Sequence, residues 1–392
     1  MSNSESLLCL YCLKEKPLDQ FSLEHVVPQF LGGAYLSDLF KSRNVCRTCN
    51  SNLGLFVDAG FEKSWIVNSH LTELAYDFFN PNSSDGLPLR CMGVTDLDIP
   101  GMSDDEICEM WLGPLGEQVF WVRPKDDRLY WYSGGNPVTA KSVRTRAYFV
   151  ASERTTKNPA VTWYAFRDAF HKRKVRKIMY TVWEGVNPKD IGFDEPNELD
   201  TEVIEYLANN CSGSQQSVQR KNQLSVNINF DQRFLAKLAL GISHSYFERS
   251  VEDAGYDKEL RNAIWKKPDD PDPEIYGCGM FTERDPLLRR ITGTPNGVTT
   301  TLVSVPEGVT LHLNIRQQLE WTVLCAKRDQ ISAEQHQALS GGLCFLMFKP
   351  LHKAINMSLP RLVAHNLGNI QHPELAEIES LHGKHKNYFH DL

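Results

Sequence analysis

The chain has no long hydrophobic run and no basic, apolar leader. No apolar stretch approaches the roughly 20 residues that a membrane helix needs. The N-terminus reads Met-Ser-Asn-Ser-Glu-Ser, without the positive start and apolar core of a signal peptide. We therefore expect a soluble, cytoplasmic protein with no membrane partner.

The chain also lacks a strong excess of either charge. It has 42 Lys and Arg against 49 Asp and Glu, a formal net charge of -7, and 41% hydrophobic residues in 392. This composition excludes a disordered polymer, because there is enough apolar material for real cores. The slight acidic excess argues against nonspecific coating of nucleic acid, which needs Lys and Arg to neutralise phosphates. A nucleic-acid role must therefore rest on a local basic patch.

The length favours two or three domains at roughly 150 residues each. Asn80 to Gly86 is a dense cluster of helix and strand breakers, and 188–200 and 212–222 have the composition of loops or linkers. We expect an α+β protein, with a small N-terminal module at 1–80, an aromatic-rich β-containing region at 81–210, and an α+β region at 211–392 that serves regulation or recognition.

Hydrophobic periodicity predicts the main elements of that body. A helix is expected over 61–79, and Asp231 is well placed to cap a helix that carries Phe234, Leu235, Leu238, Ala239 and Ile242. A further helix is expected over 258–267. The expected strands, several of them antiparallel, cover 117–123, 128–133, 146–151, 161–166, 224–230, 298–305, 309–315, 321–326 and 343–348.

Four of the ten cysteines form two Cys-x-x-Cys pairs near the N-terminus, Cys9 with Cys12 and Cys46 with Cys49. In a reducing compartment such pairs are better explained as metal ligands than as disulfides. Two pairs supply the four thiolates of a closed, tetrahedral zinc site, which is structural because no position is left for water. The alternative is two buried or redox-active pairs. In so small a module, zinc would supply much of the folding free energy.

The sequence between and around these pairs carries a second pattern. It reads Ser22-Leu-Glu24-His25-Val-Val-Pro28-Gln-Phe-Leu-Gly32-Gly33, then Asn44-Val-Cys46-Arg-Thr-Cys49-Asn50. An acidic-His-x-x-Pro element, a Gly-Gly, a central Asn and Cys-x-x-Cys-Asn follow in that order. Over about its first 60 residues the chain resembles the HNH endonucleases, the ββα-metal nucleases whose fold is tied by four zinc-binding cysteines.

The resemblance implies a role for each matching residue. His25 would be the general base, Glu24 and Asn50 the oxygen ligands of a catalytic Mg²⁺ or Mn²⁺, and Asn44 the residue that orients His25. These roles agree with the chemistry: histidine can accept a proton at neutral pH, and hard oxygen ligands suit these ions. Many members of the family have Asp where this chain has Glu24, which reaches an ion with a different rotamer.

Other residues near this pattern have two interpretations each. Asn52 and Asp58 follow the second pair on a predicted helix, where a solvated face is the plainer interpretation and a further carboxylate contact from Asp58 the alternative. The C-terminal His382, His385 and His390 resemble metal ligands, but a flexible polar tail explains them more simply.

Two basic groups are candidates for phosphate contacts. Arg43 and Arg47 flank the second cysteine pair and so adjoin the predicted site. A run at 171–177 lies downstream of aromatic residues that could stack on bases, although a solvated charged face is the more common role of such a run. Its candidate cations are Lys172, Arg173, Lys174, Arg176 and Lys177.

We therefore expect a metal-dependent HNH endonuclease that hydrolyses DNA, with structural zinc and catalytic magnesium or manganese. The large body suggests a regulated antiphage defence or restriction nuclease that responds to a partner protein or a signal. Because one active site breaks one strand, cleavage of both strands needs a homodimer or a second encounter. The alternative is a zinc-stabilised module that binds nucleic acid or protein and whose nuclease site is inactive.

Overall fold

The computed structural model shows an α+β chain whose contacts fall into two compact units. Unit 1 joins 1–62 with 227–381, and unit 2 joins 63–226 with 382–392. The N-terminal module thus shares a unit with the C-terminal region, which the expected ranges 1–80, 81–210 and 211–392 did not anticipate. The structure describes residues 6–80, 87–125, 145–170, 173–180, 187–211, 221–223, 229–252, 254–267 and 269–390.

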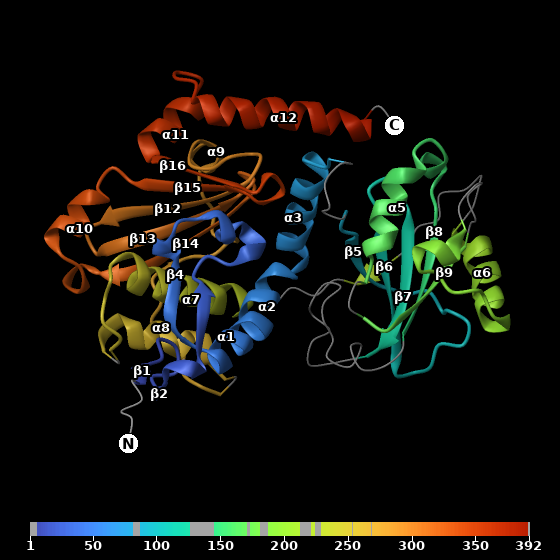
Figure 1. The fold of residues 1–392 in the computed structure, drawn as a ribbon, viewed down its shortest axis with the longest axis horizontal. Coiled ribbons are helices and arrows are strands. Elements are labelled where there is room, and N and C mark those ends of the chain that lie inside the picture. The colour runs from blue at the N-terminus through green and yellow to red at the C-terminus, as the bar shows by residue number, and fades with distance from the viewer. Residues whose placement is uncertain are drawn as a thin grey trace. The chain divides into compact units, whose positions relative to one another are not determined.

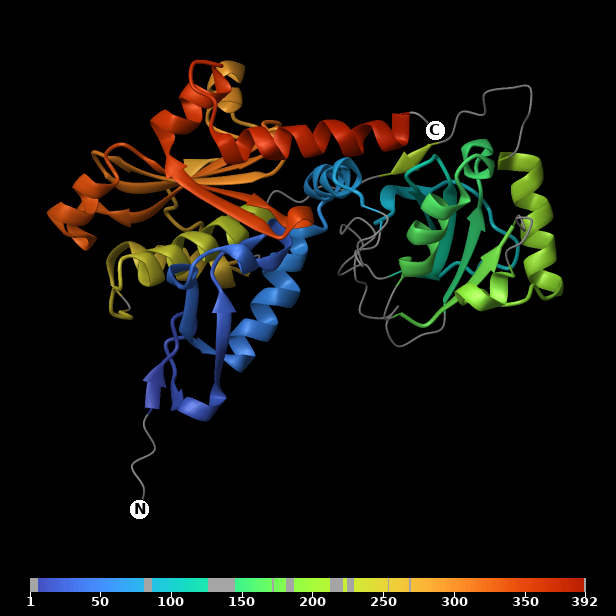
Figure 2. The ribbon, with the colours of Figure 1, turned by 45° about the horizontal axis from the view of Figure 1, so that its top comes forward.

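The N-terminal part of unit 1 consists of two small hairpins followed by helix, drawn in blue in Figures 1 and 2. The strands β1 (Ser6–Leu8) and β2 (Glu15–Pro17) pair antiparallel, as do β3 (Phe21–His25) and β4 (Lys41–Cys46). Helix α1 (Arg47–Leu53) then continues through the π-helical turn η5 (Gly54–Asp58) into α2 (Ala59–Glu62). The expected ββα module is therefore present. Short 3₁₀ turns connect it at η1 (Leu18–Gln20), η2 (Gln29–Leu31), η3 (Gly33–Tyr35) and η4 (Asp38–Phe40).

A six-stranded antiparallel sheet forms the C-terminal part of unit 1, in the order β11-β14-β13-β12-β15-β16. The strands expected over 298–305, 309–315, 321–326 and 343–348 are confirmed. Gly308 closes the hairpin between β12 and β13, where a Cβ would lie 2.0 Å from the Ala326 carbonyl oxygen. The strands are β11 (Gly277–Cys278), β12 (Val298–Val305), β13 (Gly308–Ile315), β14 (Leu319–Lys327), β15 (Leu343–Phe348) and β16 (Lys353–Ser358).

Helix α7 (Asn229–Tyr246) packs against β14, η5 and the first hairpins, and links the two parts of unit 1. Its expected apolar stripe is buried, but the helix begins before Asp231, which lies in its first turn and accepts a hydrogen bond from Trp321 Nε1 at 2.8 Å. The strand expected over 224–230 is therefore wrong at its C-terminal end; 224–228 lie outside the described residues. The other helical segments are α8 (Gly255–Trp265), α9 (Pro286–Ile291), η8 (Arg328–Gln330), α10 (Ala333–Ala338), η9 (Lys349–Leu351), α11 (Leu359–Asn366) and α12 (Pro373–His390).

A buried aromatic cluster joins the N-terminal module to α7 and the sheet. Phe61 of α2 stacks on Phe234 of α7, with ring centroids 4.0 Å apart, and meets the edge of Trp321 of β14 at 5.1 Å. Phe40 meets Phe345 of β15 edge to face at 4.6 Å. The module therefore has no separate core, because its largest apolar side chains are buried against residues from the other end of the chain.

Unit 2 is a six-stranded sheet with helices on both faces, in the order β10-β5-β6-β7-β8-β9, shown in cyan to green in Figure 1. Neighbouring residues of β7 alternate between faces: Trp121 packs in the cluster that includes α5, and Phe120 in the cluster that includes α6. Only β8 and β9 pair in parallel among the described strands of this sheet, and α5 connects them. The elements are α3 (Trp65–Asp77), β5 (Arg90–Thr95), β6 (Glu106–Leu112), β7 (Gln118–Pro124), β8 (Thr145–Val150), η6 (Glu153–Thr156), α5 (Pro159–Asp168), β9 (Val175–Met179), η7 (Pro188–Ile191), α6 (Glu198–Cys211) and β10 (Asn222–Gln223).

Several expectations for unit 2 need correction. The helix expected over 61–79 and the strands over 117–123 and 146–151 are confirmed, but 161–166 is part of helix α5, not a strand. Pro159 at the first helical position starts that helix, and Val161 and Ala165 point to one face of it. The loop expected over 188–200 contains η7 and the start of α6. The strand expected over 128–133 and most of the loop expected over 212–222 lie outside the described residues.

The C-terminus is helical where a flexible tail was expected. Helix α12 extends to His390, and His382 Nε2 lies 3.4 Å from Asp77 Oδ2. The side chains of His385 and His390 lie outside the described residues. None of the helices in the described segments combines the length and apolar composition of a membrane span.

Replacing Phe61 with Ala should destabilise unit 1 strongly. Phe61 is 0% exposed, and the cavity left among Phe234 and Trp321 should cost about 3–5 kcal/mol in the free energy of unfolding. Phe56→Ala is the matched control, because Phe56 lies one turn away and is 44% exposed, so its loss should cost under about 0.5 kcal/mol. Denaturant unfolding measures both; equal losses would contradict the shared core.

Asp231 should make stability depend on pH. Burial raises its pKa from the ordinary 3.8 to about 6, against the opposing hydrogen bond from Trp321. Between pH 7 and 5 the folded state takes up a proton that the unfolded state does not, so the wild type should gain about 1 kcal/mol that Asp231→Asn lacks. Thermal unfolding of both proteins across this range measures the difference. Parallel pH profiles would show that Asp231 titrates normally.

Candidate functional site

The four cysteines of the two pairs converge on one point of the N-terminal module. Their Sγ atoms all lie within 4.8 Å of one another. Cys9 and Cys12 lie on the turn between β1 and β2, which is closed by a hydrogen bond from Leu13 N to Cys9 O at 2.9 Å, with Leu13 in the left-handed region at φ 55°. Cys46 ends β4, and Cys49 lies in the first turn of α1. The structure thus brings together all four predicted zinc ligands.

Hydrogen bonds within the cluster orient the sulfur atoms. Cys46 N donates to Cys9 Sγ at 3.4 Å, and Cys49 N donates to Cys46 Sγ at 3.5 Å. Lys16 Nζ donates a hydrogen bond to Cys46 Sγ at 3.3 Å. A hydrogen bond from Cys49 is the main cause of a lowered pKa at Cys9. Four converging sulfur donors with these contacts fit a structural metal such as zinc.

Glu24 and His25 are neighbours at the end of β3, but their side chains lie in different environments. Glu24 is 5% exposed and points into unit 1, where its Oε1 lies 2.7 Å from Nζ of Lys237 on α7. The same Nζ lies 2.6 Å from Asp58 Oδ2. Asp58 is therefore not on a solvated helix face as the sequence suggested, whereas Asn52 is exposed. One buried lysine thus joins β3, η5 and α7.

His25 lies on the other side of the strand and is partly accessible. Its Nδ1 is 3.4 Å from Gln29 Nε2. Partial burial is the main cause that lowers the pKa of His25 below 6.5, and the positive charges of Lys41 and Lys237 lower it further. The imidazole is therefore neutral at pH 7, the form that can accept a proton.

Asn50 ties the helix to the strand that carries these residues. Its Nδ2 donates to Ser22 Oγ and to Leu23 O, both at 3.0 Å. Because Asn50 directly follows Cys49, the cysteine cluster fixes the position from which this amide reaches β3. Asn44 is exposed on β4, and its carbonyl oxygen accepts a hydrogen bond from Leu10 N at 2.8 Å, which connects β4 to the first cysteine turn.

Glycine is required in the turn that follows His25. Gly33 N donates to Pro28 O at 3.1 Å, and a Cβ at Gly33 would lie 1.7 Å from the Val27 carbonyl oxygen. Gly32 has φ 101°, which side chains of L residues rarely adopt. The Gly-Gly of the sequence motif therefore permits the tight turn that places β3 against the rest of the module.

The candidate phosphate contacts lie in both units. Arg43 and Arg47 are exposed on the N-terminal module, and Arg47 Nε donates to Phe21 O at 3.4 Å. The run at 173–177 belongs to unit 2, with Lys174 exposed and Lys172 outside the described residues. The other three cations have partners within the unit: Arg173 lies over the ring of Trp121, Arg176 pairs with Asp200 at 2.7 Å, and Lys177 reaches the Arg167 carbonyl oxygen at 3.3 Å.

Sequence reasoning missed Lys237. Its neighbours along α7 form an apolar stripe, Phe234, Leu238 and Gly241 among them. A lysine in the middle of such a stripe was a detectable signal, because a buried lysine needs a partner of opposite charge. Its partners could not be identified, since nothing local connects position 237 to 24 or 58.

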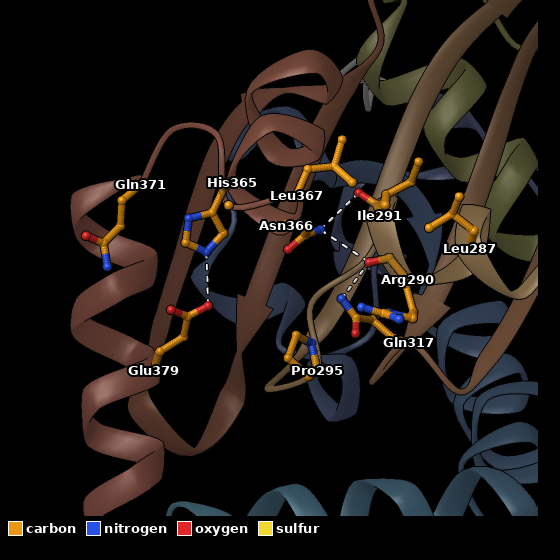
Figure 3. Close-up of a pocket in the computed structure, with 11 residues that line it drawn as sticks. Leu287, Arg290, Ile291, Pro295, Gln317, His365, Asn366, Leu367, Gln371 and Glu379 are labelled. Atoms are coloured by element: carbon orange, nitrogen blue, oxygen red, sulfur yellow. Dashed lines mark hydrogen bonds and ion pairs between the residues drawn. The ribbon is translucent and has the colours of Figure 1, made fainter.

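A hollow in the C-terminal part of unit 1 lies beside α9, α11 and α12 and has a volume of about 470 Å³. Several of its polar side chains are bonded to the protein itself: His365 Nε2 lies 3.0 Å from Glu379 Oε1, and Asn366 Nδ2 donates to Ile291 O at 2.9 Å (Figure 3). Its lining residues include none of the candidates in the N-terminal module. The cysteine cluster and the end of β3 therefore remain the candidate site.

Comparison with known families agrees with the site. Residues 9–66 match the family model of the HNH endonucleases, which confirms the resemblance drawn from the motifs. No curated protein and no solved structure matches the chain. The N-terminus therefore carries an HNH domain, and the family supports a nuclease type of function; the match does not extend beyond residue 66.

Replacing Cys46 with Ser should release the structural metal. Cys46 is buried in the four-sulfur cluster, so its loss leaves three ligands and removes the acceptor for Cys49 N. We expect loss of bound zinc and a lower unfolding temperature, measured by elemental analysis and thermal unfolding. Cys278→Ser is the control, since Cys278 is exposed and outside the cluster. Full zinc content in Cys46→Ser would contradict a four-cysteine site.

Proposed function

We propose that this protein is a metal-dependent HNH endonuclease that hydrolyses phosphodiester bonds of DNA. The observation that carries the proposal is the position of His25. It is a partly accessible, neutral imidazole at the end of a strand, held by a ββα module with a four-cysteine cluster. A neutral imidazole with access to solvent can take a proton from an attacking water, a step that contributes about 10² to 10⁴ in rate.

The other residues of the motif would hold and orient the reacting groups. Glu24 and Asn50 would ligate a catalytic Mg²⁺ or Mn²⁺, which when bound neutralises charge on the phosphate and assists the leaving oxygen. Asn44 would fix the segment that orients His25. Arg43 and Arg47 are exposed near the module's cysteine cluster and would contact the DNA backbone.

The residues fit such an ion in donor type. A carboxylate oxygen and a side-chain amide oxygen are groups that bind hard divalent ions. The orientation of Glu24 is less simple, because its carboxylate is already in contact with the Lys237 ammonium. The donor set therefore supports a divalent ion, and the contact with Lys237 needs an explanation of its own.

The wider role follows from charge and size. The net charge of -7 and the internal partners of Arg173, Arg176 and Lys177 favour modest DNA affinity that depends on Arg43, Arg47 and Lys174. We propose a regulated defence or restriction nuclease, which nicks as a monomer and cuts both strands as a dimer or in two encounters. The competing function is a zinc-stabilised binding module. Such a module would not need His25, Asn44 and Asn50 together, so their presence favours the nuclease.

His25→Ala should abolish most cleavage. Plasmid DNA is incubated with the full chain and Mg²⁺ or Mn²⁺, and the variant should cut about 10² to 10⁴ times more slowly because the general base is gone. Asn52→Ala is the control, since Asn52 is exposed on the neighbouring helix α1 and should cut like the wild type. Equal cleavage by wild type and His25→Ala would refute the role of His25. No cleavage by any protein, with DNA still bound, would favour the binding module.

A further inference from the structure

Lys237 makes a buried contact with two carboxylates of the N-terminal module, Glu24 and Asp58. The Lys237 side chain is 1% exposed, and its Nζ lies 2.7 Å from Glu24 Oε1 and 2.6 Å from Asp58 Oδ2. The lysine comes from α7, well outside the segment that matches the HNH family. A carboxylate that the HNH motif marks as an ion ligand is thus engaged by a cation from the body of the protein.

The surroundings show that neither the charges nor the hydrogen-bonding atoms of this cluster are fully paired. Two carboxylates and one ammonium leave one excess negative charge in a buried place. Asp58 Oδ1 and the hydroxyl oxygen of Tyr11 are buried without a hydrogen-bond partner among the described residues. Buried oxygen atoms of this kind ordinarily have partners, so the cluster has acceptor oxygens that Lys237 alone does not satisfy.

Packing alone does not account for a lysine here. Gly241, one turn along α7, would clash through a Cβ with Val26 Cγ1 at 2.8 Å, so the helix lies close against the module at this point. The aromatic cluster around Phe61 already binds α7 to the module. Burying an ion pair stabilises a fold less than apolar residues of the same volume commonly do. The charge of Lys237 therefore calls for a role beyond packing.

We propose that Lys237 is a built-in cation that competes with the catalytic divalent ion for the Glu24 carboxylate. The ammonium neutralises Glu24 and repels a second cation on the same group. Helix α7 thereby sets how tightly the HNH module holds its ion. The inference rests on the proposed nuclease function, because it assigns regulation to that same site.

Divalent-ion binding tests this without any cleavage. Mn²⁺ is titrated into the zinc-loaded full chain and followed by electron paramagnetic resonance. Lys237→Met keeps the chain length and removes the charge, and should bind Mn²⁺ at least about tenfold more tightly, since one adjacent charge shifts an ionic equilibrium by about one unit or more. Lys237→Arg keeps the charge and should bind like the wild type. Lys258→Met, at an exposed lysine on α8 of the same unit, controls for the general loss of one positive charge.

Two double variants show where the gain arises. Lys237→Met with Glu24→Gln should lose the tighter binding, because the competed ligand is gone. Lys237→Met with Asp58→Asn leaves one buried carboxylate instead of two, so it folds if the single variant does not, and should keep the gain. Equal Mn²⁺ affinity in wild type and in the folded Lys237 variants would overturn the proposal. So would a gain that survives Glu24→Gln.

These results are distinguishable from failure of the nuclease function. A tenfold gain in Mn²⁺ affinity that depends on Glu24 supports the competition even if no DNA is cut. Cleavage that depends on His25 but no change in Mn²⁺ affinity would refute the role of Lys237 and leave the nuclease intact.

Discussion

The burial of one lysine between two carboxylates constrains the whole of unit 1. Lys237 is removed from water, so its ammonium needs a carboxylate beside it, and Glu24 and Asp58 in turn need the lysine, because an unpaired buried charge is strongly destabilising. Glu24 is at the end of β3, Asp58 ends η5, and Lys237 is in the middle of α7. The position of the strand that carries His25 therefore depends on contacts with the C-terminal region.

The cysteine cluster supplies the other fixed point of the module. It ties the turn after β1 to the start of α1, and Asn50 then reaches β3 from the position next to Cys49. A metal there would order the two hairpins, but it cannot supply a core. That comes from Phe61 and its neighbours, which pack on α7 and β14. The four cysteines thus connect the segments of the HNH domain, and apolar residues of α7 and β14 complete its hydrophobic core.

The features that could be predicted from the sequence were those determined by residues close together along the chain. The cysteine pairs and the short apolar strands β12 to β15 are recognised from neighbours along the chain, and both were correctly predicted. The helix over 161–166 was missed because its aromatic and β-branched residues resemble a strand, and only Pro159 and the sheet around it decide the matter. Asp58 was assigned to solvent because its partner is 179 positions away. The misplaced residues are therefore those whose environment is set by distant segments.

Glu24 and His25 face different environments, so the two side chains are subject to different constraints. His25 is partly accessible and its pKa is lowered by partial burial, which favours the neutral imidazole that the proposed general base requires. Glu24 is buried and neutralised by a residue of the body. In the proposed nuclease, an available base leaves the divalent ion and the access to DNA as the two points at which cleavage can be restrained. Under this proposal the N-terminal motif supplies the reacting groups, and Lys237 of the body is the residue that competes for one of them.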